Sequence, residues 1–201
     1  DTPMPYIEFE KKENIILTCG RIGHFLKNNE MLIEAYISDP LIYENYDLHL
    51  IGPYSEEFKN YLDHIKLQNN LFKSKIKLIG PINDREDLYR YMSKCKIFIM
   101  TSRLESFCFA MWEAAACGCY IVSTDFSPAK DVTQNGTIGT LVKNEDIKAL
   151  GGKLKKIIQN PSEMKGKAST CRNFVLENYS WSAVCDKAVK YLKIDEVGNG
   201  K

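Results

Sequence analysis

The sequence predicts a doubly wound, Rossmann-like α/β domain, in which a parallel sheet carries helices on both faces and further helices follow at the C-terminal end. Short apolar runs alternate with longer amphipathic segments, and the connections between them are short. The short runs are apolar throughout, which is typical of strands buried on both faces of a parallel sheet. Two of them end in Gly-Pro, a pair that stops a strand.

Six strands are expected, each an apolar run that stops at a glycine or at a polar turn. The first three runs end at Gly20, at Gly52-Pro53 and at Gly80-Pro81. The expected strand ranges are 14–19, 47–51, 76–79, 96–101, 120–123 and 139–142.

The segments between these runs have the apolar repeat of helices. Either Asn28 or Asn29 is placed to cap the first of them. The expected helix ranges are 29–38, 56–68, 84–93, 109–117, a short turn near 128–132, and about 144–159, 162–178 and 181–193. We divide the chain into a linker (1–13), a main domain (14–178) and a C-terminal helix with its tail (179–201).

Length and composition suit one well-cored domain, or a large domain with an appendage. The chain has 201 residues, 44% of them hydrophobic, and a net charge of +1, which gives no reason to expect a nucleic-acid partner. It begins with Asp-Thr-Pro, so we expect it to be a piece of a longer protein. Charge is uneven: residues 1–142 hold 15 basic and 19 acidic side chains, and residues 143–201 hold 12 and 7.

The seven cysteines are odd in number and irregularly spaced, and Cys117-Gly-Cys119 lacks the gap of a zinc knuckle or a thioredoxin-like pair. We therefore interpret them as reduced thiols and the compartment as cytoplasmic. No apolar stretch reaches the roughly 18 residues of a membrane span.

Two loops are candidates for binding phosphate. Neither the dinucleotide nor the Walker fingerprint occurs, because the run from Gly20 to Gly23 lacks the third glycine and no Gly-Lys-Ser/Thr is present. In parallel sheets ligands bind beyond the carboxyl ends of strands, where helix N-termini offer free amides. The loop 20–27 holds Arg21 and Lys27, and the loop 105–110 leads into the next helix.

That helix lies in the apolar run 107–122, whose single charge is Glu113. A carboxylate on so apolar a helix needs a polar partner. A ligand is one candidate, since phosphates on the unpaired amides of Phe109, Ala110 and Met111 would place a ribose near Glu113. A salt bridge, for example to Arg103, is the alternative.

A set of motifs in fixed order resembles a known family. Two glutamates stand in Glu105-Ser-Phe-Cys-Phe-Ala-Met-Trp-Glu113, followed by Ala-Ala-Ala-Cys-Gly-Cys; Gly20-Arg21 precedes Lys27, and Asn-Gly-x-x-Gly-x-Leu-Val covers 135–142. These segments are similar to the C-terminal, donor-binding half of retaining GT-B-type glycosyltransferases, the glycosyl transferases group 1 family. Positions two and four of the family's Glu-Gly-Phe-Gly are Ser106 and Cys108 here.

The resemblance implies a retaining transfer of a hexose from a UDP- or GDP-type sugar, with no other cofactor. It assigns catalytic roles to Arg21 and Lys27, which would neutralise the leaving diphosphate, and to Glu105, which would take hydroxyls of the transferred sugar. Phosphate binding would fall to residues 107–110 and ribose binding to Glu113. The donor-binding residues implied are Pro81, Ile82, Phe107, Cys108, Phe109, Ala110 and Glu113.

The resemblance also sets the expected partners. A glycan or lipid-linked acceptor would bind a missing N-terminal half, so the isolated domain is expected to bind nucleotide without turnover, in a pathway of cell-surface glycan synthesis. No Asp-x-Asp motif occurs, so no metal is expected. A nucleotide-sugar epimerase, with Glu105 and His24 as acid–base candidates, and a non-catalytic nucleotide-binding domain are the alternatives.

Basic side chains in the C-terminal third allow two interpretations of that surface. They form either a solvated face or a surface for peripheral association with the inner face of a membrane. The residues concerned are Lys148, Lys153, Lys155, Lys156, Lys165, Lys167 and Arg172.

Overall fold

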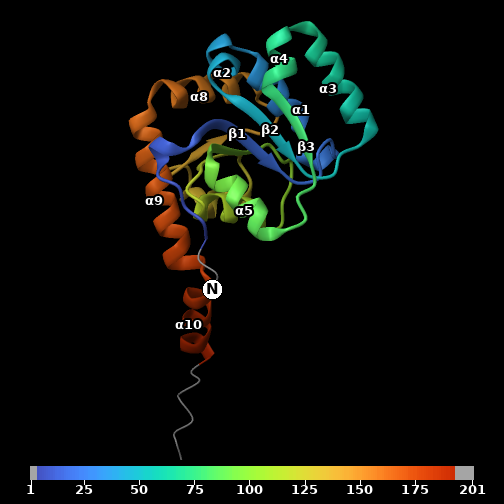
Figure 1. Ribbon diagram of the computed structural model, residues 1–201. Coiled ribbons are helices and arrows are strands. Elements are labelled where there is room, and N and C mark those ends of the chain that lie inside the picture. The colour runs from blue at the N-terminus through green and yellow to red at the C-terminus, as the bar shows by residue number, and fades with distance from the viewer. Residues whose placement is uncertain (1–3, 193–201) are drawn as a thin grey trace, which may run out of the picture.

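A computed structural model describes residues 4–192 and shows a six-stranded, wholly parallel sheet (Figure 1). The strands lie in the order β3-β2-β1-β4-β5-β6. Their bounds are β1 Glu13–Cys19, β2 Asp47–Ile51, β3 Ile76–Gly80, β4 Cys95–Met100, β5 Tyr120–Thr124 and β6 Thr140–Val142. This is the doubly wound order, which reverses direction between β1 and β4, so the predicted fold class is confirmed.

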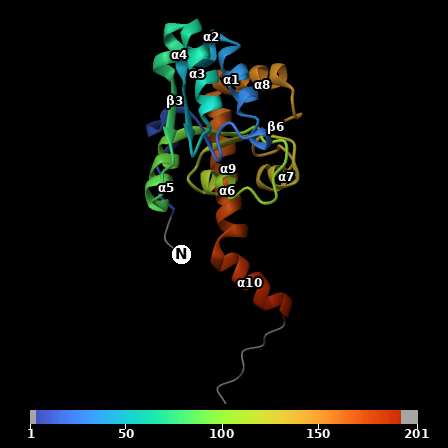
Figure 2. The same ribbon diagram turned by 90° about the vertical axis from the view of Figure 1, so that its right-hand side faces the viewer.

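Helices cover both faces of the sheet (Figures 1 and 2). One face carries α1 Asn29–Ile37, α2 Pro40–Asn45, α3 Glu56–Gln68, α4 Asn70–Lys75 and α8 Ile147–Gln159. The other carries α5 Arg85–Lys94, α6 Phe109–Ala116, α7 Ser127–Thr133 and part of α9 Pro161–Tyr179. Each layer buries its own hydrophobic cluster against the sheet.

Alternation along the strands separates the two clusters. Ile16 of β1 packs into the α1–α4 cluster, whereas Ile15 and Leu17 pack into the α5–α7 cluster. Central strands are buried on both faces, as their apolar sequences predict, while edge strand β3 exposes Lys77 and Ile79.

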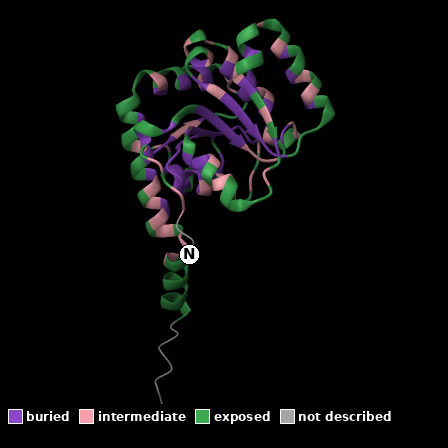
Figure 3. Ribbon diagram, in the orientation of Figure 1, coloured by how far each residue is buried: buried purple, intermediate pink, exposed green. Residues whose placement is uncertain are grey.

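Helix α9 joins the two layers, and α10 leaves them. Met164 and Ala168 of α9 belong to the first cluster and Cys171 to the second. Helix α10, Trp181–Leu192, extends away from the domain and has no buried residue (Figures 2 and 3). No helix within 4–192 has the length and apolar character needed to cross a bilayer.

Four short elements were not predicted: α2, α4 and the 3-10 turns η1 Phe9–Lys11 and η2 Phe25–Lys27. Side-chain caps begin both helices, because Asp39 Oδ1 accepts from Leu41 N and Asn69 Oδ1 accepts from Leu71 N, each at 2.9 Å. One and a half turns are too short to show a helical repeat, so only the caps could have marked them.

Residues 4–13 of the predicted linker pack against the domain. Phe9 belongs to the core, and the buried Lys12 ammonium donates to Ser93 O and, at 2.9 Å, to Cys117 O. Residues 1–3 of the linker and 193–201 of the predicted tail lie outside the described residues.

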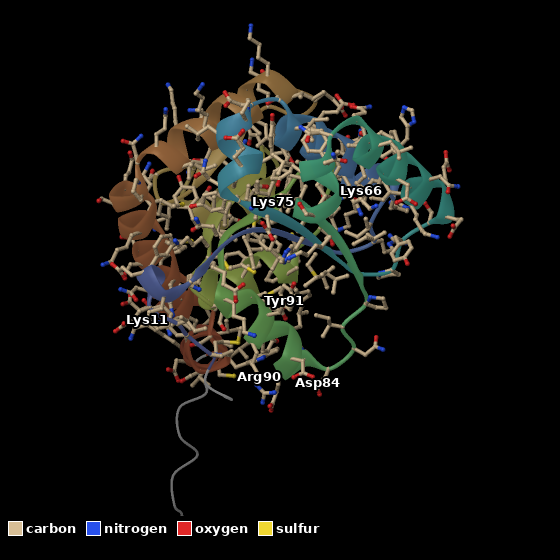
Figure 4. All side chains as sticks on the ribbon, turned by 45° about the horizontal axis from the view of Figure 1, so that its top comes forward. Lys11, Lys66, Lys75, Asp84, Arg90 and Tyr91 are labelled. Atoms are coloured by element: carbon tan, nitrogen blue, oxygen red, sulfur yellow. The ribbon has the colours of Figure 1, made fainter. Side chains whose placement is uncertain are left out.

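A side-chain contact links helix α5 to strand β2. Figure 4 shows Asp84 and Arg90 on its outer side and Tyr91 toward the strands, where the Tyr91 hydroxyl lies 2.8 Å from His49 Nδ1 on β2. Burial lowers the pKa of His49 to about 4, and Lys77 adds to that effect against the opposing charge of Asp47. His49 is therefore neutral in the folded protein at neutral pH.

Candidate functional site

The carboxyl edge of the sheet is formed by the loops 20–28, 81–84, 101–108 and 143–146 that follow strands. The predicted site residues lie in the first three of these loops and on α6, which follows the third. Two of these loops follow β1 and β4, the strands between which the order reverses. Thr101 Oγ1 donates to Lys27 O at 3.1 Å and to Asn28 O at 2.9 Å, and Arg103 N donates to Leu26 O at 2.8 Å. The strand order and these bonds fix the two predicted loops side by side.

Lys27 and Glu105, 78 residues apart in the sequence, form an ion pair across these loops. Their side chains are 20% and 11% exposed, so the pair is largely shielded from water. The Ser102 hydroxyl donates to the same Glu105 oxygen, Oε1, at 2.6 Å. The lysine stem passes over Gly20, where a Cβ would lie 3.4 Å from Lys27 Cε.

Arg21 lies exposed beside this pair. It lines a small open hollow with Lys27, Gly20 and Cys19. Among residues 4–192 its guanidinium has no ion-pair partner, so its charge is available to an anion at this edge of the sheet.

Helix α6 begins beside the pair, and Cys108 is its N-cap with φ 63° and ψ 56°. No side chain caps the helix, and the N–H groups of Phe109 and Ala110 have no acceptor within the part of the chain that is described. The Met111 amide donates to Cys108 O at 3.0 Å, so the prediction that it is free was wrong. Two unpaired amides at a helix start attract an anion.

Cys108 occupies the left-handed conformation that glycine adopts without cost. Burial, followed by the Glu105 charge, raises the pKa of its thiol to about 12. The thiol is therefore protonated and is no nucleophile at neutral pH.

Glu113 lies on the side of α6 that faces α5, with 16% of its side chain exposed. Its Oε1 accepts from Arg85 Nη2 at 2.6 Å and from the Tyr89 hydroxyl at 3.0 Å. Arg103 is not its partner, contrary to the alternative derived from the sequence. Arg103 instead bonds Glu145 at 2.5 Å and stacks over Phe25, with 4.3 Å from its guanidinium carbon to the ring centroid.

Sequence reasoning missed Arg85 and Tyr89. Both lie on α5, one turn apart, directly after the loop with Pro81 and Ile82. Their spacing of four residues puts them on one face of that helix, but nothing in the sequence indicates that this face meets Glu113. Pro81 is exposed and Ile82 packs partly into the α5–α7 cluster.

Asn28 and Asn29 support the first loop rather than capping α1. Asn28 holds the N-cap position with φ 47°, and its side chain donates to Glu145 Oε2 at 3.3 Å. Asn29 Oδ1 accepts from Gly23 N at 2.8 Å. The predicted position of the cap is confirmed, but neither side chain forms the capping bond.

Exposed apolar side chains surround the site. Phe107 and Phe109 are 45% and 64% exposed, with ring centroids 4.6 Å apart, and Phe107 stacks on Trp112. Phe25, Leu26 and Leu104 on the neighbouring loops are exposed as well. Apolar surface grouped in this way is typical of a face that another protein segment covers.

Known structures share this fold. The C-terminal domain of the LpcC protein of Francisella tularensis aligns with a TM-score of 0.77 and 20% identity, over 89% of this chain and 97% of that one. TarM aligns with a TM-score of 0.77 and 18% identity, over 94% and 37%. HepE of Anabaena, solved in complex with UDP and glucose, aligns with a TM-score of 0.74 and 18% identity, over 90% and 48%.

Relatives are also found by sequence. An N-acetylgalactosaminyltransferase of Campylobacter jejuni that acts on a diphospho-undecaprenol-linked sugar is 30% identical over 171 residues, 78% of this chain and 43% of that protein. The capsular polysaccharide biosynthesis glycosyltransferase CapM of Staphylococcus aureus is 24% identical over 77% and 40%. The chain thus spans less than half the length of these relatives.

The family model "Glycosyl transferases group 1" matches residues 4–174. This chain therefore belongs to the glycosyl transferases group 1 family, and its fold is the C-terminal-like half of a GT-B glycosyltransferase.

Proposed function

We propose that this chain is the donor-binding half of a retaining glycosyltransferase, which transfers a hexose from a UDP- or GDP-type nucleotide sugar to an acceptor. The observation that carries the proposal is the meeting of Lys27, Glu105 and Arg21 beside the uncapped start of α6. Cations, free amides and a shielded carboxylate thus converge at the point where the strand order reverses.

In this proposal the donor diphosphate lies against the start of α6. The amides of Phe109 and Ala110 donate to it, and Arg21 and Lys27 neutralise its charge as the bond to the sugar breaks. Fixed donors and cations aimed at a developing negative charge are a strong catalytic device. The residues 107–110 then form the phosphate-binding part of the site.

In this proposal, diphosphate binding also changes the partners of the Glu105 carboxylate. Lys27 exchanges part of its interaction with Glu105 for the phosphates, which leaves the carboxylate to accept hydroxyls of the transferred sugar. Ser102 holds Oε1 at 2.6 Å throughout, so Glu105 stays in place while its partner changes.

Glu113 binds the ribose in the same proposal, while Pro81 and Ile82 hold the base through backbone contacts. Arg85 and Tyr89 both bind Oε1 of Glu113, and among residues 4–192 its Oε2 has no hydrogen-bond partner. That oxygen is available to two ribose hydroxyls.

A second half completes the enzyme. The relatives are more than twice as long as the aligned region. The exposed apolar side chains around the site, among them Phe107 and Phe109, form a surface that the second half could cover. We propose that it binds a glycan or lipid-linked acceptor in cell-surface glycan synthesis, and that the isolated chain binds nucleotide without transfer. The names of the C. jejuni and S. aureus relatives support this class of acceptor.

We place the protein in the cytoplasm, at the inner face of the membrane where a lipid-linked acceptor requires it. Its seven cysteines are free thiols, as expected in a reducing compartment. We also propose that binding is independent of metal, and EDTA added to the assay below tests this directly.

Thermal unfolding in the presence of UDP, GDP, ADP and their sugars tests the proposal, since a ligand that binds only the folded state raises Tm. Selective stabilisation by UDP or GDP is expected, and Glu113→Gln should abolish most of it. Glu86→Gln, which removes an exposed carboxylate of α5, is the control and should leave the response unchanged. A flat response to every nucleotide at millimolar concentration would contradict the proposal.

Product analysis separates this proposal from the epimerase alternative. A nucleotide-sugar epimerase needs a side chain that accepts a proton from the sugar. In the present proposal Glu105, held by Ser102, only accepts hydrogen bonds from sugar hydroxyls. Incubation with a nucleotide sugar should yield no epimer, and transfer should appear only when the second half and an acceptor are supplied.

A further inference from the structure

A second polar pocket lies at the opposite, amino edge of the sheet, where β5 and β6 begin. Helix α8 leads into α9 beside these strands (Figure 1), and the two helices border an open pocket of about 190 Å³. We refer to it as the α8–α9 pocket; its polar lining includes Lys153, Lys156, Lys167, Asn160, Tyr120 and Thr140. The volume corresponds to about six water molecules, which suits a small polar ligand.

The lysines of the pocket account for part of the positive charge of the C-terminal third. Three other cations there are engaged elsewhere: Lys155 pairs with Asp39 at 2.8 Å, Lys165 pairs with Glu10, and Arg172 donates to Ala116 O at 3.0 Å. Lys153 and Lys156, which line the pocket, have no ion-pair partner among residues 4–192, and the same holds for Lys143, Lys148, Lys187 and Lys190 outside it.

The pocket keeps a net positive charge after its internal pairing. Lys167 pairs with Glu163 at 2.8 Å, and both belong to the lining. Lys153 and Lys156 remain, with a combined charge of +2. A phosphate monoester carries nearly two negative charges at neutral pH, so its charge matches this remainder.

Two of the lining residues carry hydroxyl groups. Tyr120, which is 2% exposed, and Thr140 lie side by side with 2.8 Å between their hydroxyl oxygens. One hydroxyl donates to the other, so the pair retains one O–H for a further acceptor. Phosphate oxygens accept from hydroxyl and ammonium donors together.

We propose that the α8–α9 pocket binds the phosphate group of a small soluble phosphate monoester. Lys153 and Lys156 supply the charge, and the Tyr120–Thr140 pair supplies a neutral donor. The site is separated from the candidate donor site by the length of the strands and involves none of its residues. It therefore stands independently of the function proposed above.

Calorimetric titration of the 201-residue chain with glycerol 3-phosphate, at constant ionic strength, tests the proposal. Binding is expected, with NMR shifts at the amides of Thr140 and Asn160. The double substitution K153A/K156A should weaken it by about tenfold or more. K66A/K148A is the charge-matched control, since it removes two lysines outside the pocket, and it should change the affinity by less than about twofold.

Two outcomes would overturn the proposal: equal weakening in both double variants, or shifts confined to residues 101–113. A third arm uses vesicles of phosphatidylglycerol and of phosphatidylcholine. Binding to the anionic vesicles that K153A/K156A abolishes, without binding of glycerol 3-phosphate, would overturn the soluble ligand and assign the phosphate to a lipid headgroup. Failure of both arms would overturn the site itself.

Discussion

The two edges of the sheet use their charged residues in opposite ways. At the carboxyl edge, the cations Lys27, Arg85 and Arg103 are paired with Glu105, Glu113 and Glu145, which lie 78, 28 and 42 residues away in the sequence. At the amino edge, Lys153 and Lys156 come from one helix and have no ion-pair partner among residues 4–192. The first arrangement depends on strand order, whereas the second depends on how two consecutive helices pack.

Left-handed backbone conformations occur at both edges of the sheet. Asn28, Cys108 and Glu145 have positive φ in loops that follow β1, β4 and β6, and Gln134 and Asn135 have it in the turn that leads into β6. Such conformations persist only where surrounding contacts hold them. Substitutions at these positive-φ residues should therefore change folding stability, whereas substitutions of the exposed Lys153 and Lys156 in the α8–α9 pocket should change binding alone.

The largest expected effect comes from Gly52→Ala. A Cβ on Gly52 would lie 1.8 Å from Gly20 O, so the backbone of β1 or β2 must move at the point where the first loop begins. We expect the free energy of unfolding, measured in urea, to fall by about 3 kcal/mol or more.

Gly80→Ala is the matched control for Gly52→Ala. Gly80 has a φ of 83° and is the last residue of β3, but a Cβ there meets no atom within 4 Å. Only backbone strain of about 1 kcal/mol is expected. Equal losses in the two variants would show that the close approach at Gly52 is not what sets the carboxyl edge.

The next effect comes from removing the ion pair between the loops. Lys27→Met leaves Glu105, with 11% of its side chain exposed, bonded to Ser102 alone. We expect a loss of about 2 kcal/mol, because a shielded carboxylate without its counter-charge is costly. Lys153→Met at the amino edge should change the unfolding free energy by less than about 0.5 kcal/mol; a comparable loss there would remove the distinction between the edges.

The contrast between the edges also explains which features the sequence predicted. Periodicity located the strands and the long helices, and the rule that ligands bind at the carboxyl ends of strands brought Lys27 and Glu105 together. Both residues lie in loops whose position follows from strand order, so knowledge of the fold class was sufficient.

Side-chain partners that depend on helix packing were not predictable. Arg85 and Tyr89 bind Glu113 because α5 lies beside α6, and the α8–α9 pocket exists because of the angle between two helices. Neither arrangement is encoded by a periodic pattern or a motif. The suggested salt bridge between Arg103 and Glu113 failed for the same reason. Arg103 is nearer to Glu113 in the sequence than Arg85 is, but its side chain contacts Glu145 after β6.

Variants at the two edges should be compared above pH 6.5, because burial of His49 lowers the free energy of unfolding in acid. The pKa of His49 is about 4 in the folded protein, against about 6.5 in the unfolded chain. Between these values the unfolded chain binds more protons, so stability falls as the pH drops, by about 2 kcal/mol at pH 5. His49→Asn should flatten this part of the pH profile in urea unfolding; an unchanged profile would contradict the assignment.

A smaller effect is expected on ligand binding when the Tyr89 hydroxyl is removed. Tyr89→Phe deletes one of two donors to Glu113 Oε1 and leaves Arg85 in place. Nucleotide affinity should fall by about fivefold, which is one hydrogen bond. Tyr91→Phe is the control on the same helix, because its hydroxyl bonds His49 instead, and it should lower Tm without changing that affinity.

The smallest effect should be a gain, obtained with Cys108→Gly. Cys108 is the N-cap residue of α6 and has φ 63°, a conformation that costs a non-glycine residue about 1–2 kcal/mol. Glycine removes this cost, but its unfolded chain has more conformational entropy, which cancels part of the gain. A net stabilisation of about 0.5 kcal/mol is expected in urea unfolding. Nucleotide should bind more tightly as well, since glycine allows a diphosphate to approach the backbone closely. Cys108→Ala keeps the Cβ and its strain, so it should show neither gain; if alanine and glycine behave alike, backbone strain at the start of α6 does not shape this site.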